Sequence, residues 1–170
     1  MAVKKTLIKH KYLLKALIPL CLFIFISGCE KSNDAFEHNH DKKPLLFDLG
    51  TVQCPQCRMP LNTLTNSVQV IVSDGKTYFF DDVGCMVLWI EDNQQMLKGL
   101  IIWVYAHDTK QWVDAKKAYY SLTDRTPMRY GFGAYENEQK NLIPFKEMRL
   151  RMLRGLTLKN PKIRKKLLGI

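Results

Sequence analysis

Residues 67–82, SVQVIVSDGKTYFFDD, decide the fold of this chain. The stretch 67–73 alternates polar and apolar residues, which is the pattern of a strand that buries one face. Asp74-Gly75 predicts a hairpin turn, because glycine tolerates the positive φ of a tight turn. The stretch 76–80 (KTYFF) is then the returning strand. These residues predict an antiparallel β-hairpin.

A helix and a third strand follow the hairpin. Asp81 and Asp82 offer N-cap carboxylates for a helix predicted over 83–97, with Met86, Trp89, Ile90 and Leu97 toward a core. Residues 100–105 (LIIWVY) then form a buried strand. Residues 45–107 are therefore predicted to be a strand–strand–helix–strand unit.

Residues 108–153 repeat this pattern more weakly and predict a second, smaller α+β unit. Strands are expected at 112–113 and 118–122, with 132–135 pairing beside them, and 142–145 is a further short apolar run. A helix follows around 147–153. We expect an α+β fold of small antiparallel sheets with packed helices, in two related strand–strand–helix–strand units.

The N-terminus has the features of a bacterial lipoprotein signal. Five lysines precede an apolar run, 16–26, that is too short to span a bilayer, which needs roughly 20 residues. Ile26-Ser27-Gly28-Cys29 resembles the lipobox, in which small residues precede the lipidated cysteine. Residues 1–28 are predicted to be a signal peptide, Cys29 the lipidated residue, and 29–44 a flexible polar tether.

This signal predicts a membrane-anchored lipoprotein that faces the periplasm, where thiols meet oxidising conditions. Glu30, rather than an aspartate associated with inner-membrane retention, follows Cys29 and favours the outer membrane. In the tether, His38 and His40 are more typical of solvated side chains than of metal ligands.

The charge of +10 is concentrated at the two ends of the chain. Residues 30–145 hold 12 basic against 15 acidic residues, whereas residues 146–170 hold nine basic residues against Glu147 alone. This distribution in an exported chain argues against nucleic-acid binding. The basic tail, 154–170, is compatible with an anionic membrane surface or with a solvated helix.

Residues 54–59, CPQCRM, concentrate the donors that could bind a metal. Two thiols and a thioether within six residues form a soft donor set, which selects Cu(I) over harder divalent ions. Pro55 and Pro60 restrict the loop and lower the entropy lost on ligation. Cys54, Cys57 and Met59 are therefore candidate Cu(I) ligands.

Three other interpretations of the CxxC pair stay open. A redox pair normally begins a helix after a strand, and no strong strand precedes Cys54. A zinc site needs further ligands, for which Cys85 and His107 are candidates without a recognised spacing. The third interpretation is a structural disulfide between the two cysteines. Covalent attachment of haem is excluded, because Arg58 occupies the position of the histidine that a CxxCH motif requires.

Among the remaining candidate donors, Met128 stands on a loop rich in glycine and proline that could present its thioether. Cys85 and Met86 are expected to be buried beside Trp89 rather than to bind a metal. No nucleophile elbow, phosphate-binding glycine loop or His-Glu-x-x-His motif is present, which favours binding over catalysis.

The order of these motifs resembles the NosL family, the accessory lipoproteins of nitrous-oxide reductase. The matching elements are Cys29, CPQCRM, DGKTYFFDD before a helix, WVDAKKAYY, and TPM ahead of GFGA. The resemblance implies a non-enzymatic Cu(I) metallochaperone that works with a copper transporter or maturation complex and supplies a copper enzyme.

Carried over by position, the resemblance implies Cys54, Cys57, Met59 and Met128 as metal ligands. Family members commonly have glycine where Arg129 stands, and their second unit normally closes with a strand rather than a basic segment. A thiol–disulfide oxidoreductase that uses Cys54 and Cys57 is the alternative function.

Overall fold

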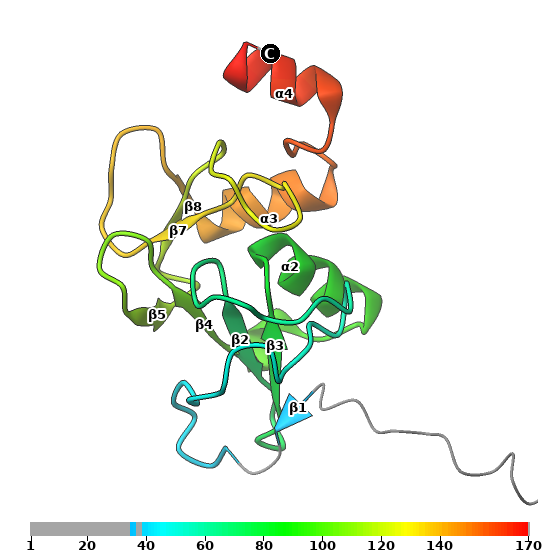
Figure 1. Cartoon of the computed structure of the whole chain (residues 1–170), viewed down its shortest axis with the longest axis vertical. Helices are drawn as coiled ribbons and strands as arrows, with labels where there is room; N and C mark the ends of the chain where they lie inside the picture. Colours follow the sequence, from blue (N-terminus) through cyan, green and yellow to red (C-terminus); the bar gives the residue numbers. More distant parts are fainter. Residues whose placement is uncertain (1–34, 37–38, 170) are drawn as a thin grey trace, which may run out of the picture. The chain divides into compact units, whose positions relative to one another are not determined.

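The computed structural model of the chain describes residues 35–36 and 39–169 (Figure 1). All of the described residues belong to one compact unit. The predicted signal peptide and lipidated Cys29 lie outside the described residues. Within those residues, no helix is both long and apolar enough to cross a membrane.

The predicted hairpin is confirmed as the centre of a five-stranded antiparallel sheet. Strands β2 (Val68–Ile71) and β3 (Thr77–Phe80) are joined by a turn in which Gly75 has a φ of +86°. Outside them lie β1 (Ala35–Phe36), β4 (Ile101–Tyr105) and β5 (Trp112–Asp114), in the order β1-β3-β2-β4-β5.

Helix α2 (Val83–Asp92) follows β3 after two residues and ends earlier than the predicted 97. The Gln94 amide binds the Glu91 carbonyl and the Gln95 amide binds that of Ile90, while Gln94 adopts a left-handed φ of +52°. This Schellman-type end satisfies the last carbonyls and turns the chain away. A short 3-10 helix, η2 (Leu97–Gly99), leads into β4.

Both faces of the central strands are covered. On one face, the Trp89 ring of α2 contacts Tyr78 and Phe80 of β3. On the other, Phe47 packs edge-on against Phe79, with 4.9 Å between ring centroids. Covering both faces explains why every residue of β2 is buried.

Residues 39–47 run along that second face, so part of the segment predicted as a tether contacts the sheet. The buried Gln69 side chain binds both the amide and the carbonyl of Leu45, at 2.8 and 2.9 Å. Trp103 donates to the Lys42 carbonyl, and Asn39 is buried and donates to Thr77. Polar side chains thus bind an irregular segment to the sheet.

A second, three-stranded sheet has the order β7-β6-β8, with β6 (Tyr119–Tyr120), β7 (Ala134–Tyr135) and β8 (Ile143–Pro144). The expected pairing of 132–135 with 118–122 is confirmed by the Tyr120–Ala134 register. Helix α3 (Phe145–Leu153) follows and contacts α2.

The α+β class with small antiparallel sheets is therefore confirmed. In the part of the chain that the structure describes, no strand follows α3; the chain instead enters helix α4 (Pro161–Leu168). The basic tail is helical there, with Asn160 as its N-cap and Pro161 in its first turn.

Candidate metal centre

The CxxC motif lies on a closed loop with its own hydrogen bonds. The Cys54 amide binds the Met59 carbonyl at 2.9 Å, and the Arg58 amide binds the Cys54 carbonyl at 2.8 Å. Arg58 adopts a left-handed φ of +64°, and Gln53 pairs with Pro60 across the base of the loop. This closure folds Cys57 back toward Cys54.

The segment after the hairpin supplies two more donors. Asp81 directly follows β3, and Cys85 lies in the first turn of α2, four residues further on. The three thiol sulfurs of Cys54, Cys57 and Cys85 and a carboxylate oxygen of Asp81 all lie within 4.8 Å of one another. We call these four residues the cysteine–aspartate cluster.

The hydrogen bonding of this cluster is incomplete. The Cys57 thiol donates to Asp81 Oδ1 at 3.1 Å. The other oxygen, Asp81 Oδ2, is buried and has no hydrogen-bond partner, the only carboxylate oxygen of which this is true among the described residues. A buried carboxylate oxygen without a donor is costly, and a cation beside it would remove that cost.

Hydrogen bonds from three sides make Cys54 the most acidic of the three thiols. The Cys85 thiol, and the backbone amides of Cys57 and Asp81, donate to Cys54 and lower its pKa despite burial. The same hydrogen bond to Cys54 raises the pKa of Cys85, and burial raises that of Cys57 to about 12. Cys54 is therefore the thiol of the cluster that loses its proton most readily.

These donors fit a thiophilic metal ion. Thiolates are the ligands preferred by Cu(I) and Zn²⁺, and a carboxylate can complete a tetrahedral zinc site. Binding a metal would replace the shared protons and give Asp81 Oδ2 a cationic partner. The cluster could thus hold a metal ion through three cysteines and one aspartate.

The two predicted thioether ligands differ in exposure. Met59 belongs to the CxxC loop, and its side chain is 37% exposed. Met128 is partly buried, and its amide binds Asp82 Oδ2 at 3.0 Å, next to Asp81. Its loop therefore folds over the start of α2, on the element that carries Cys85.

Two side chains hold the Met128 loop against α2. Asp82 caps the helix by accepting from the Gly84 amide at 2.8 Å, and burial raises the pKa of this carboxyl to about 6. Gly84 has no side chain, and the Tyr130 ring fills the space that a Cβ would occupy. The glycine therefore permits the close approach of the two segments.

His107, considered as a further ligand, is bound elsewhere. Its Nδ1 lies 3.1 Å from Asp124 and its Nε2 lies 2.9 Å from the side-chain oxygen of Asn66. Tyr135 donates to the same Asp124 oxygen at 2.9 Å. These four residues, the histidine–aspartate network, form a polar group separate from the cysteine–aspartate cluster.

From the sequence, Cys85 is expected in the core and is only a spare candidate for zinc ligation, and Asp81 and Asp82 are both N-cap candidates. Cys85 is indeed buried, but it also lies in the cluster, and the N-cap is Asp82. The signal that could have found both is the spacing Asp81-x-x-x-Cys85. A residue at the strand end and one in the first helical turn point to the same place when strand and helix are joined directly.

Comparison of the sequence with protein-family models and with curated proteins finds no match. The fold and the site therefore define the class: a small α+β protein with a candidate metal centre of three cysteines and one aspartate.

Proposed function

We propose that the chain is a membrane-anchored Cu(I) metallochaperone that delivers copper to a periplasmic copper enzyme. The observation that carries this proposal is the convergence of Cys54, Cys57 and Cys85 within 4.8 Å. Three polarisable sulfurs at that separation suit monovalent copper better than harder divalent ions. The cargo would be held by the two loop cysteines and Cys85.

Exposure of one side of the cluster supports transfer rather than permanent storage. Cys54 and Cys85 are buried, whereas Cys57 is only partly buried and Met59 of the same loop is exposed. A partner protein could therefore approach the ion from the side of Cys57. The exposed Met59 thioether would offer a weak first contact for incoming or leaving Cu(I).

The proposed client rests on the resemblance to the NosL family. On that basis the copper enzyme is nitrous-oxide reductase, and a copper transporter or maturation complex is the other partner. Lipidation of Cys29 would hold the chaperone at the membrane, facing the periplasm.

A structural zinc site is a second candidate, and one observation favours it. The fourth donor of the cluster is the Asp81 carboxylate, a hard ligand that suits zinc better than Cu(I). Zinc would then be held permanently by three thiolates and one carboxylate.

The oxidoreductase alternative has less support from the geometry. An attacking thiol should be accessible and have a lowered pKa. Cys54 has the lowered pKa but is buried, and the more accessible Cys57 has a pKa of about 12.

The test is anaerobic titration of the full chain in detergent with Cu(I) against a chromophoric chelator, repeated in the presence of zinc. We expect about one Cu(I) per chain, no displacement by equimolar zinc, and loss of binding in Cys54→Ser/Cys57→Ser. A matched control, Met86→Leu/Met96→Leu, removes two sulfur atoms outside the cluster and should bind normally.

Retention of copper by the Cys54→Ser/Cys57→Ser variant would contradict the proposal. Preferential retention of zinc would assign the cluster to the structural zinc site. Insulin reduction by the metal-free chain at a thioredoxin-like rate would instead favour the oxidoreductase.

A further inference from the structure

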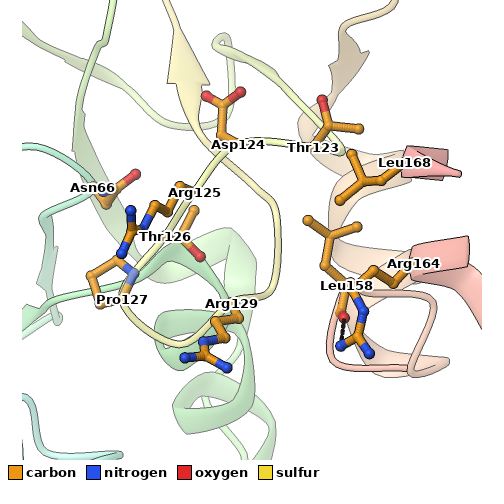
Figure 2. Close-up of a pocket in the computed structure, with 10 residues that line it drawn as sticks. All are labelled: Asn66, Thr123, Asp124, Arg125, Thr126, Pro127, Arg129, Leu158, Arg164 and Leu168. Carbon is orange, nitrogen blue, oxygen red and sulfur yellow. Dashed lines mark hydrogen bonds between the residues drawn. The ribbon is translucent and has the colours of Figure 1, made fainter. Parts of the chain in front are cut away.

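A cleft of about 890 Å³ lies apart from the cysteine–aspartate cluster. Figure 2 shows residues of the loop 123–129 on one wall and residues of the C-terminal segment on the other. None of the four cluster residues lines it. The cleft is lined by Asn66, Thr123, Asp124, Arg125, Thr126, Pro127, Arg129, Leu158, Arg164 and Leu168.

Three arginines give this cleft an excess of positive charge. Arg125 and Arg129 come from the loop wall and Arg164 from α4 on the opposite wall (Figure 2). No ion pair joins any of them to an acidic residue among those the structure describes. Among the described residues, the Arg164 guanidinium donates one hydrogen bond, to the Leu158 carbonyl at 3.5 Å. Their charges are therefore available to a ligand.

The single acidic residue of the cleft is already engaged. Burial raises the pKa of Asp124, but hydrogen bonds from His107, Ser121 and Tyr135 outweigh burial and lower the net pKa. The carboxylate is thus ionised and held by its own donors in the histidine–aspartate network. It offsets one of the three arginine charges and leaves the cleft with a net positive charge.

The loop wall is held in place before any ligand binds. The Thr126 hydroxyl accepts from the Tyr130 amide at 3.1 Å, and Asp82 accepts from the Met128 amide at 3.0 Å. Between these contacts, Arg129 adopts a left-handed φ of +58°. A constrained backbone lowers the entropy that the loop loses when a ligand binds.

We propose that this cleft binds a ligand that carries a phosphate group. Arginine matches phosphate because the planar guanidinium donates two parallel hydrogen bonds to its oxygens. Arginines on facing walls suit a group with several acceptor oxygens better than a single carboxylate. Leu158 and Leu168 beside them can contact an apolar part of the same ligand.

A phosphate of this kind could belong to a soluble phosphate ester or to a phospholipid headgroup. The test follows arginine side-chain resonances by NMR in the full chain held in neutral detergent micelles. One arm adds glycerol phosphate, a second adds phosphatidylglycerol to the micelles, and phosphatidylcholine serves as the neutral lipid control.

The variant Arg129→Gln/Arg164→Gln removes one charge from each wall. The matched control Lys162→Gln/Lys166→Gln removes the same charge from exposed positions of α4 that do not line the cleft. We expect saturable shifts of Arg129 and Arg164, and affinity lowered by about tenfold or more in the arginine variant only. All four substituted side chains are exposed, so the variants should fold normally.

Saturation by glycerol phosphate identifies a soluble ligand, and saturation by phosphatidylglycerol alone identifies a lipid headgroup. Absence of a saturable shift with either probe overturns the proposal. Equal weakening in both variants also overturns it, because the binding would then come from the general charge of α4.

Discussion

Two polar groups in this protein differ in how completely their hydrogen bonds are satisfied. In the histidine–aspartate network, Asp124 is bound by His107 and Tyr135, and the second ring nitrogen of His107 is bound to Asn66. In the cysteine–aspartate cluster, Asp81 Oδ2 is buried without a partner. The polar side chains of the first group hydrogen-bond to one another, whereas the second group leaves one buried carboxylate oxygen without a hydrogen-bond donor.

This difference separates a structural group from a candidate binding site. Buried polar groups are normally paired, and an exception calls for an explanation such as an ion. The histidine–aspartate network joins the end of β4 to β7, where the His107 amide also binds the Ala134 carbonyl at 2.7 Å. It therefore stabilises the contact between the two sheets, whereas the cysteine–aspartate cluster is the candidate metal site.

The largest effect should come from Cys85→Ser. Loss of a partner that only supports a metal ligand lowers metal affinity by up to about 100-fold. Loss of one of the three convergent sulfurs removes a direct ligand, so Cu(I) affinity should fall by more than that. Anaerobic chelator competition measures this change. Met86→Leu removes a neighbouring buried sulfur outside the cluster and should leave affinity unchanged. Unchanged affinity in Cys85→Ser would show that the loop cysteines act alone.

A smaller loss should follow Asp81→Asn, which keeps the size of the side chain but removes its charge. We expect metal affinity to fall by about 10- to 100-fold. The metal-free protein should keep or gain stability, because the substitution removes a charge from a buried position. Chelator competition and urea unfolding of the metal-free protein measure the two effects. A large loss of stability would place Asp81 in the scaffold instead.

The opposite pattern is expected for Asp124→Asn. Metal affinity should be unchanged, while the free energy of unfolding falls by about 1–2 kcal/mol because charge-assisted hydrogen bonds are lost. The pKa of Asp124 is lowered in the folded protein, so its stabilisation is present above the ordinary aspartate range and is lost as the pH falls through the lowered value. The asparagine variant should lack this dependence in urea unfolding against pH.

The smallest effect should come from Met59→Leu. Because the Met59 side chain is exposed, its thioether contributes little to equilibrium binding, and affinity should change by less than about threefold. Stopped-flow transfer of Cu(I) to a chelator measures whether the rate changes while affinity does not. Met128→Leu is the matched comparison on the neighbouring loop. A loss of affinity above tenfold in Met59→Leu would place this sulfur among the main ligands.

Local patterns predicted the hairpin and most other elements well. Alternation over 67–73 and the Asp74-Gly75 turn depend on neighbouring residues only, and both are confirmed. The predicted end of α2 at residue 97 was wrong, because Gln94 ends the helix in a left-handed conformation that is typical of glycine or asparagine. Arg129 also adopts a left-handed conformation. Positive φ at residues other than glycine leaves no clear pattern in the sequence.

The sequence by itself determined the pair of loop thiols, Cys54 and Cys57, because their spacing lets two sulfurs meet within one turn of chain. Only the tertiary structure decided that Asp81 and Cys85 join them, since Asp81 lies 24 positions after Cys57. The hairpin ends directly before Asp81 and brings this residue next to Cys57 of the loop. Local spacing controls short-range contacts, whereas long-range contacts depend on how the sheet and α2 pack together.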